Sequence, residues 1–179
     1  MEGGFVVAKD PSVAEKVEWM RRYGHKGFED YHGVGINGKL SEVHAAMGLA
    51  QFPHLSKVIQ RRREIASAYR SAIESMNGLE PVPLRDLESA NHAYFPVLVG
   101  EDYPLSCDEL YDQLRANGIN SRRYFYPLLS NFGMDRGPRS GMPSELPVAL
   151  DAAARVICLP IYPALNDADQ TRVIECLQT

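Results

Sequence analysis

The stretch GVGINGKLSEVHAAMG, from Gly33 to Gly48, decides the fold because it sets a glycine-rich loop directly before a helix. Ser41 is a typical N-cap residue, and Glu42 places a negative charge in the first turn, which suits the helix dipole. Free backbone N–H groups at a helix N-terminus attract phosphate, the amide of Asn37 can donate to it, and Lys39 adds a positive charge. The stretch therefore predicts either an ordinary capped helix or one half of a phosphate site.

The residues before Pro53 predict few elements of their own. They are a short apolar strand at Gly3–Val7, a helix from Pro11 to Gly24 with Asp10 as its N-cap, and a helix that begins after Ser41. One strand and two helices cannot make a well-covered sheet. We therefore expect the apolar faces of the Val13 and Val43 helices to be exposed, and the chain to aggregate or dimerise.

Apolar residues at helical spacing from Leu55 to Met76 predict one long helix that ends at about Gly78, and Pro53 predicts a kink or break before it. Beyond Pro81 the elements alternate as in a small α/β lobe. They are a strand at His92–Gly100, a helix capped by Ser106 and Glu109 that runs to Gly118, a strand at Ser121–Pro127, a polar loop to about Ser144, a helix at Pro147–Ile157, an extended segment at Cys158–Pro163 and a final helix capped by Asn166. Pro96 indicates a bulge or an edge position in the first of these strands.

Composition and charge argue against several classes of protein. The chain has 179 residues, 45% of them hydrophobic, and its net charge of -4 weighs against a nucleic-acid partner. The three cysteines form no CxxC and the five histidines no HExxH or HxxxH, so neither a disulfide framework nor a metal site is expected. No apolar run is long enough to cross a bilayer, and the first residues, MEGGFVVAKD, have no signal-peptide pattern. We expect a cytoplasmic protein without a membrane partner.

The segments GVGINGKLSEVHAAMGLAQ, RRREIASAYRSAI and RRYFYPL are three of six that together resemble the nucleotide-sugar aminotransferases of the DegT/StrS family. GVGINGKLSEVHAAMGLAQ is similar to the family segment G-x-N-x-[RK]-[ML]-S-E-x-x-A-A-x-G-L. Glu2–Gly24 resembles the family's EGG, strand and helix ending in R-x-x-G, and RRREIASAYRSAI resembles its R-R-x-x-A-x-x-Y helix. NHAYFPVLV resembles a strand of the small domain, RRYFYPL the sugar-side strand and CLPIYPAL the late L-P-x-x-P. The resemblance covers nearly the whole chain, in the right order.

The resemblance implies an α/β fold, the C-terminal part of a PLP-dependent transferase of fold type I. Residues 1–53 would be a remnant of the large domain that binds pyridoxal 5'-phosphate (PLP), residues 54–80 a long connecting helix and residues 81–179 the small domain. Enzymes of this family move an amino group, usually from glutamate, onto a keto sugar attached to a nucleotide, and the YFYP wording favours dTDP-4-keto-6-deoxy sugars. They act as dimers with the active site at the subunit boundary. The expected partners are therefore a second copy or a full-length homologue, and a nucleotide-sugar substrate.

The resemblance also assigns a role to the opening stretch. Asn37 matches an asparagine that reaches across to the phosphate of the PLP in the neighbouring subunit. Lys39 stands where many members have arginine, so it keeps the charge but lacks the bidentate fork. His25 and His32, on the loop before Asn37, either line the active site or are ordinary loop residues.

Four residues of SRRYFYP are candidates for substrate contacts. Arg122 or Arg123 suits a diphosphate, whereas Tyr124 and Tyr126 suit sugar and base contacts. The alternative is an ordinary strand whose aromatic side chains belong to the core, since aromatics are common in any sheet.

PLP chemistry needs a lysine that holds the cofactor as a Schiff base, and in this family it lies a few residues before the E-G-G. This chain begins with MEGG. We therefore expect the C-terminal portion of an aminotransferase, with no catalytic residue of its own, no transaminase activity alone and no stable PLP binding alone. Two alternatives stay open. One is a fragment of a PLP- or PMP-dependent sugar dehydratase, which carries histidine in place of the lysine. The other is a non-catalytic lobe that pairs with a full-length homologue.

Overall fold

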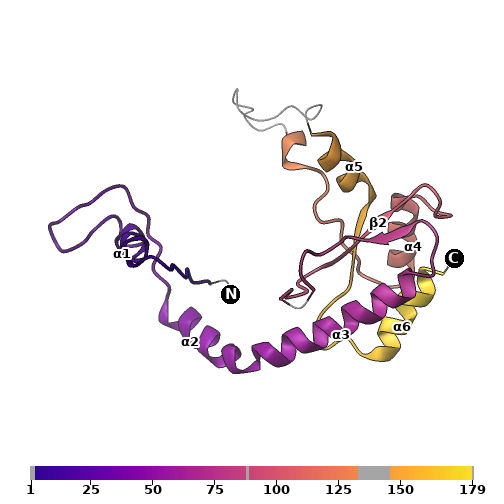
Figure 1. Cartoon of the computed structure of the whole chain (residues 1–179), viewed down its shortest axis with the longest axis horizontal. Helices are drawn as coiled ribbons and strands as arrows, with labels where there is room; N and C mark the ends of the chain where they lie inside the picture. The colour runs from indigo at the N-terminus through magenta and orange to yellow at the C-terminus, as the bar shows by residue number, and fades with distance from the viewer. Residues whose placement is uncertain (1–2, 88, 133–145, 179) are drawn as a thin grey trace. The chain divides into compact units, whose positions relative to one another are not determined.

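The computed structural model describes residues 3–87, 89–132 and 146–178. The chain divides into two compact units, residues 1–55 and residues 56–179. The first unit contains the helices α1 (Pro11–Met20) and α2 (Glu42–Gln51) and the short 3-10 helix η1 (Phe52–His54). The second unit contains nearly all of the long helix α3 (Leu55–Ile73) together with the strands and the remaining helices (Figure 1).

Both helices of the first unit begin at the predicted N-caps. The Asp10 carboxylate accepts the backbone N–H of Ser12 at 2.8 Å, and the Ser41 hydroxyl accepts that of His44 at 3.4 Å. The strand predicted at Gly3–Val7 is wrong, since no strand is assigned to these residues. A strand needs a neighbour for its backbone N–H and C=O groups, and the described part of the first unit contains no other strand.

The helical run breaks at Pro53 as predicted. Helix α2 ends at Gln51, η1 contains the proline, and α3 begins again at Leu55. Helix α3 ends at Ile73, earlier than predicted, and a turn follows it as far as Gly78. At Gly78 the φ angle is +76°, and a Cβ atom would lie 2.1 Å from the backbone nitrogen of Tyr103, so the turn requires glycine here.

A three-stranded antiparallel sheet forms the centre of the second unit. Its strands are β1 (Leu79–Pro81), β2 (Phe95–Val99) and β3 (Val156–Leu159), in the order β1-β2-β3. The predicted bulge or edge position of Pro96 is wrong, because β2 is the central strand. The C=O of Pro96 accepts the N–H of Val82, which lies just beyond the end of β1. In antiparallel strands the nitrogen and the carbonyl of one residue point to the same side, so the ring nitrogen of Pro96 also faces Val82. Pro96 is tolerated in the central strand for this reason.

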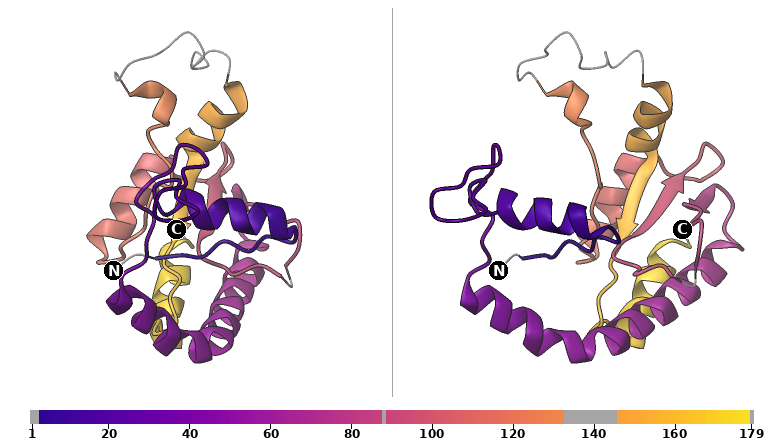
Figure 2. Two further views of the ribbon diagram at one scale, coloured as in Figure 1. Left: turned by 90° about the vertical axis from the view of Figure 1, so that its left-hand side faces the viewer. Right: turned by 60° about the vertical axis from the view of Figure 1, so that its left-hand side comes forward.

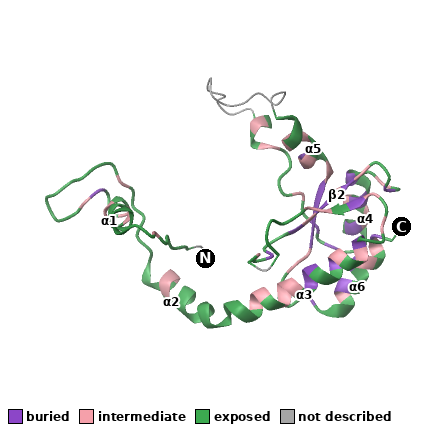
Figure 3. Cartoon of the chain, viewed as in Figure 1, coloured by how far each residue is buried: buried purple, intermediate pink, exposed green. Residues whose placement is uncertain are grey.

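The core of the second unit lies between this sheet and three helices. Tyr69 of α3, Leu110 of α4 (Cys107–Ala116) and Val173 of α6 (Asp167–Cys176) are all buried. Figure 3 shows that the buried residues gather on the strands and on the helices around them. The Gln170 amide of α6 donates to the carbonyl of Ile65 in α3 at 2.9 Å, which fixes these two helices side by side. Helix α4 carries the predicted capping box.

The region around α5 (Pro147–Arg155) departs from the prediction in two places. Helix α5 ends two residues early because Val156 and Ile157 already belong to β3, and Figure 2 shows α5 leading directly into that strand. The strand predicted at Ser121–Pro127 is wrong: only Arg122 pairs, with Cys158, and the chain then turns away. The predicted polar loop includes the short 3-10 helix η2 (Leu129–Asn131) and otherwise lies largely outside the described residues.

Across the described ranges, no helix combines the length and the apolar character needed to span a membrane. Within the same ranges, no group of three or more His, Cys, Asp or Glu side chains is arranged to hold a metal ion.

Candidate functional site

The loop before α2 is built on a close crossing of two backbone segments. The N–H of Gly38 donates to the carbonyl of Arg21 at 2.8 Å, which ties the two segments together. Where Gly24 and Gly35 meet, a Cβ atom on Gly35 would lie 2.2 Å from the backbone nitrogen of Gly24. Real side chains never approach that closely, so Gly35 of the predicted motif is needed to fold the loop itself.

This loop presents Asn37 and Lys39 to solvent directly before α2. The backbone of Asn37 forms an isolated bridge with Arg22, and its side-chain amide makes no hydrogen bond within the described part of the chain. The Lys39 ammonium lies 5.2 Å from the centroid of the Tyr23 ring, a cation–π contact. Both polar groups are therefore available to a phosphate that approaches from outside the chain.

All five lysines of the chain are exposed in the structure: Lys9, Lys16, Lys26, Lys39 and Lys57. The hydrogen bond with Glu15 raises the pKa of Lys26, which favours the protonated amine, whereas Schiff-base formation needs the neutral amine. The amide of Asn37 and the exposed ammonium of Lys39 thus fit the phosphate end of PLP, whereas Lys26 is poorly suited to its aldehyde end.

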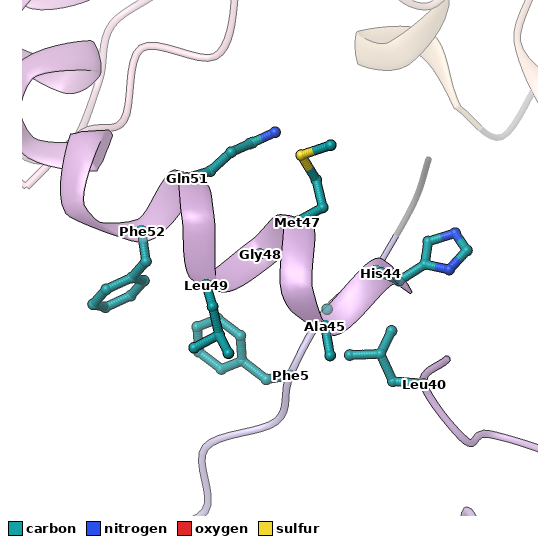
Figure 4. A pocket seen from close by; sticks show the side chains of 11 residues that line it. Phe5, Leu40, His44, Ala45, Met47, Gly48, Leu49, Gln51 and Phe52 are labelled. Atoms are coloured by element: carbon teal, nitrogen blue, oxygen red, sulfur yellow. The ribbon is translucent and has the colours of Figure 1, made fainter. Parts of the chain in front are cut away.

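An apolar depression lies along α2 in the first unit (Figure 4). Figure 4 shows Phe5 and Leu49 among the residues that line the depression, with Leu40 near the start of the helix. Leu49 is 76% exposed and Phe52 is 65% exposed. Exposed apolar residues that line one depression form a patch, unlike the single apolar residues that are common on protein surfaces. The exposed face of this helix was predicted from Val43, but the part that Phe5 and Phe52 play was missed.

All four sugar-side candidates lie around one hollow on the surface of the second unit, with a volume of about 1090 Å³. Its wall is formed mainly by residues 122–130, and the other lining residues are Tyr111 of α4, Phe132, Leu146 and Ala149 of α5. The hollow therefore lies where the segment after Arg122 leaves the sheet, in place of the strand that the sequence predicts.

The structure distinguishes sharply between the two adjacent arginines. The Arg123 side chain is only 14% exposed, forms an ion pair with Asp108 and donates to the carbonyl of Ala154 at 2.9 Å. Arg122 is exposed, and within the described residues its guanidinium has no hydrogen bond or ion pair. Arg122 is thus the better candidate for an anionic ligand, whereas the contacts of Arg123 hold the wall of the hollow together.

The aromatic candidates lie outside the core. Tyr124 keeps 38% and Tyr126 54% of its surface exposed. Tyr124 packs edge-on against Tyr94, with 5.2 Å between the two ring centroids. The ring centroids of Tyr124 and Phe125 are 5.0 Å apart. Sequence reasoning missed Tyr94 and Phe125, although both belong to quoted segments, because no local pattern indicates that the two segments meet.

Comparisons with known proteins agree on one family. The model of the DegT/DnrJ/EryC1/StrS aminotransferase family matches residues 1–178. The dTDP-4-amino-4,6-dideoxy-D-glucose transaminase of Escherichia coli is 36% identical over 176 residues, which are 98% of this chain and 47% of that protein. The dTDP-3-amino-3,4,6-trideoxy-alpha-D-glucose transaminase of Streptomyces venezuelae is 30% identical over 99% of this chain and 45% of its own length.

The solved structures give the same answer. The crystal structure of DesV from S. venezuelae in complex with a ketimine intermediate matches 96% of this chain and 45% of its own, with a TM-score of 0.83 and 27% sequence identity. This chain spans about half the length of the curated relatives it matches. Because the match to the family model runs through both units, the chain belongs to the DegT/DnrJ/EryC1/StrS aminotransferase family.

Proposed function

We propose that this chain is the C-terminal portion of a PLP-dependent aminotransferase that transfers an amino group from glutamate to a nucleotide-linked keto sugar of the dTDP-4-keto-6-deoxy type. The observation that carries the proposal is the hollow in which the unpaired Arg122 lies among exposed aromatic side chains. The names of the relatives from E. coli and S. venezuelae, both dTDP-sugar transaminases, support this substrate class.

In this proposal the hollow binds the nucleotide sugar. The Arg122 guanidinium pairs with phosphate oxygens, for which its planar fork is well suited. The exposed rings of Tyr94, Tyr124 and Phe125 offer apolar faces to the base or the sugar, and the Tyr126 hydroxyl offers a hydrogen bond. The contacts of Arg123 keep these side chains in place.

The same proposal assigns the first unit to the cofactor. Asn37 and Lys39 contact the phosphate of PLP held by a partner subunit, either a second copy or a full-length homologue. When bound, PLP supplies the electron sink that amino transfer needs. The Schiff-base lysine comes from outside the five lysines of this chain, so the chain alone is inactive. Residues 1–53 are then part of the large domain, residues 54–80 the connecting helix and residues 81–179 the small domain.

Calorimetric titration of the chain with a dTDP-linked keto sugar tests the substrate assignment. Binding is expected for the wild type and should weaken about tenfold in Tyr124→Ala, because stacking of a base on an aromatic ring is worth about 1–3 kcal/mol. Tyr31→Ala is the matched control, since Tyr31 is an exposed tyrosine of the first unit. No binding by the wild type, or equal binding by Tyr124→Ala, would refute the assignment.

A further inference from the structure

A second, smaller pocket in the second unit, of about 250 Å³, lies beside the hollow and shares Tyr111 and Arg122 with it. Its other lining residues are Arg115, Ile119, Asn120 and Ser121. Every lining residue except Ile119 carries a polar side-chain group. This composition is unlike that of the hollow, whose wall is mostly aromatic and aliphatic.

Two positive charges of this pocket have no counter-charge within the described residues. Arg115 and Arg122 are both exposed, and neither guanidinium makes an ion pair or a hydrogen bond there. Asp112 precedes Arg115 by three residues on α4, yet no ion pair joins them. The other arginines nearby are engaged, since Arg123 pairs with Asp108 and Arg172 with Asp169.

A buried hydroxyl without a partner gives a second, independent indication of a ligand. Ser121 is only 5% exposed, and its Oγ atom has no hydrogen-bond partner in the described chain. Leaving a buried hydroxyl unpaired costs about 1–3 kcal/mol, so such groups are normally satisfied. Ser121 is also one of the residues that line the pocket, and it directly precedes Arg122 in the chain.

We propose that Arg115, Ser121 and Arg122 form a binding pocket for a phosphoryl group. The arginines supply charge-assisted hydrogen bonds and the hydroxyl a third donor. Arg115 lies in the last turn of α4, whose dipole places roughly half a negative charge there, but two full positive charges outweigh it. The ligand is either a free phosphate or pyrophosphate ion, or the phosphoryl group of a nucleotide that lies in the adjacent hollow. The free-ion alternative does not depend on the proposed transaminase function, whereas the nucleotide alternative rests on it, because Arg122 is also the residue proposed to pair with the phosphates of the nucleotide sugar.

Titration calorimetry of the whole chain with inorganic phosphate, pyrophosphate and dTDP tests the pocket. Pyrophosphate should bind the wild type, bind at least about tenfold more weakly to Arg115→Gln and to Arg122→Gln, and bind Arg85→Gln like the wild type. Arg85 is a matched control because it is also exposed and lies outside both cavities. If dTDP binds more tightly than pyrophosphate and Tyr124→Ala removes the difference, the phosphoryl group belongs to a nucleotide. Equal affinities for the two assign the pocket to a free ion.

Ser121→Ala separates a binding role from a structural one. Without phosphate this variant should unfold at the same temperature as the wild type or slightly higher, because it removes an unpaired buried hydroxyl. With pyrophosphate it should lose most of the stabilisation that the wild type gains. Absence of pyrophosphate binding by the wild type, or unchanged binding by Arg115→Gln, would overturn the proposal. Loss of binding in Arg122→Gln but not in Arg115→Gln would also overturn it, because the ligand would then lie in the hollow alone.

Discussion

The guanidinium of Arg123 lies over the ring of Tyr126, 4.1 Å from its centroid, and also pairs with Asp108 and the carbonyl of Ala154. Asp108 belongs to α4 and Ala154 to α5, so one side chain joins two helices to the segment that walls the hollow. Arg123 therefore acts on the candidate site as a positioning residue, by fixing Tyr126 and its neighbours.

Replacing Arg123 by glutamine should lower the free energy of unfolding by about 1–3 kcal/mol, because the hydrogen bond to Ala154 and the stacking on Tyr126 are lost together. Arg123→Lys should recover little, since an ammonium group has no planar fork. Urea unfolding followed by circular dichroism measures both variants.

Asp108→Asn is the control for this pair, because it removes the charge but little packing. The Asp108 side chain is 79% exposed, so solvent screens its ion pair, and the loss should stay below about 1 kcal/mol. A loss as large as that of Arg123→Gln would mean that the ion pair, and not the buried contacts, holds the segment.

Helix starts could be predicted because they depend on residues close in sequence. Asp10, Ser41, Ser106 and Asn166 each accept a hydrogen bond from a backbone N–H two or three residues later. Strand membership depends on a distant partner. The strand predicted at Gly3–Val7 was therefore wrong, since a short apolar run alone does not supply the second strand.

The candidate site was predictable as a set of residues but not as an arrangement. The sequence indicates two arginines side by side at Arg122 and Arg123 without distinguishing them. The distinction depends on Asp108 and Ala154, which are 15 and 31 residues away along the chain. The unpaired Ser121 hydroxyl has no sequence signal at all, because serine is normally satisfied in a loop.

Gly35→Ala should destabilise the first unit by about 3 kcal/mol, since its new Cβ atom would lie 2.2 Å from the backbone of Gly24 and the loop must open. Gly48→Ala is the matched control. It lies inside α2 with no atom within 4 Å of the added Cβ, so it should stabilise the helix by up to about 1 kcal/mol. Trp19 is the only tryptophan and lies in the first unit, so its fluorescence during urea unfolding reports on that unit. Equal stability of the two variants would show that the crossing is not tight.

The apolar depression along α2 should make the chain self-associate. Sedimentation velocity is expected to show species larger than a monomer, and the double substitution Leu49→Glu and Phe52→Glu should shift them toward monomer. Val148→Glu is the control, since Val148 is 82% exposed on α5 and is not one of the residues that line the depression. A wild-type chain that stays monomeric at high concentration would contradict this prediction.

Asn37→Ala should leave folding unchanged, because the amide has no hydrogen bond within the described chain. When the chain is combined with a PLP-containing homologous subunit, the same change should weaken PLP retention by about tenfold, the effect of losing one hydrogen bond to a charged group. Asn37→Asp should weaken it further, since a carboxylate repels phosphate. Retention is measured from PLP absorbance after dialysis, and folding from Trp19 fluorescence. Equal retention by wild type and Asn37→Asp would exclude a phosphate contact.

His92, three residues before β2, is buried, and its burial lowers the pKa of its imidazole. The positive charges of Arg63 and Arg70 lower this pKa further, while a hydrogen bond to the backbone of Leu87 works in the opposite direction. In the unfolded chain the pKa of a histidine is about 6.5. The unfolded state therefore takes up the proton more readily. The contribution of neutral His92 to the free energy of unfolding is fully present above about pH 6.5, and it is lost as the pH falls toward the lower pKa of the folded state.

His92→Asn tests this dependence, because asparagine does not titrate and tolerates the positive φ of +45° at this position. Between pH 7 and pH 5.5 the thermal midpoint of the second unit should fall in the wild type and fall less in the variant. The other four histidines, at positions 25, 32, 44 and 54, are present in both proteins, so the difference between the two curves isolates His92. Carboxylates with lowered pKa values, such as those of Glu15 and Glu109, titrate below this range. Parallel curves for the two proteins would mean that His92 takes up its proton equally well when folded and unfolded.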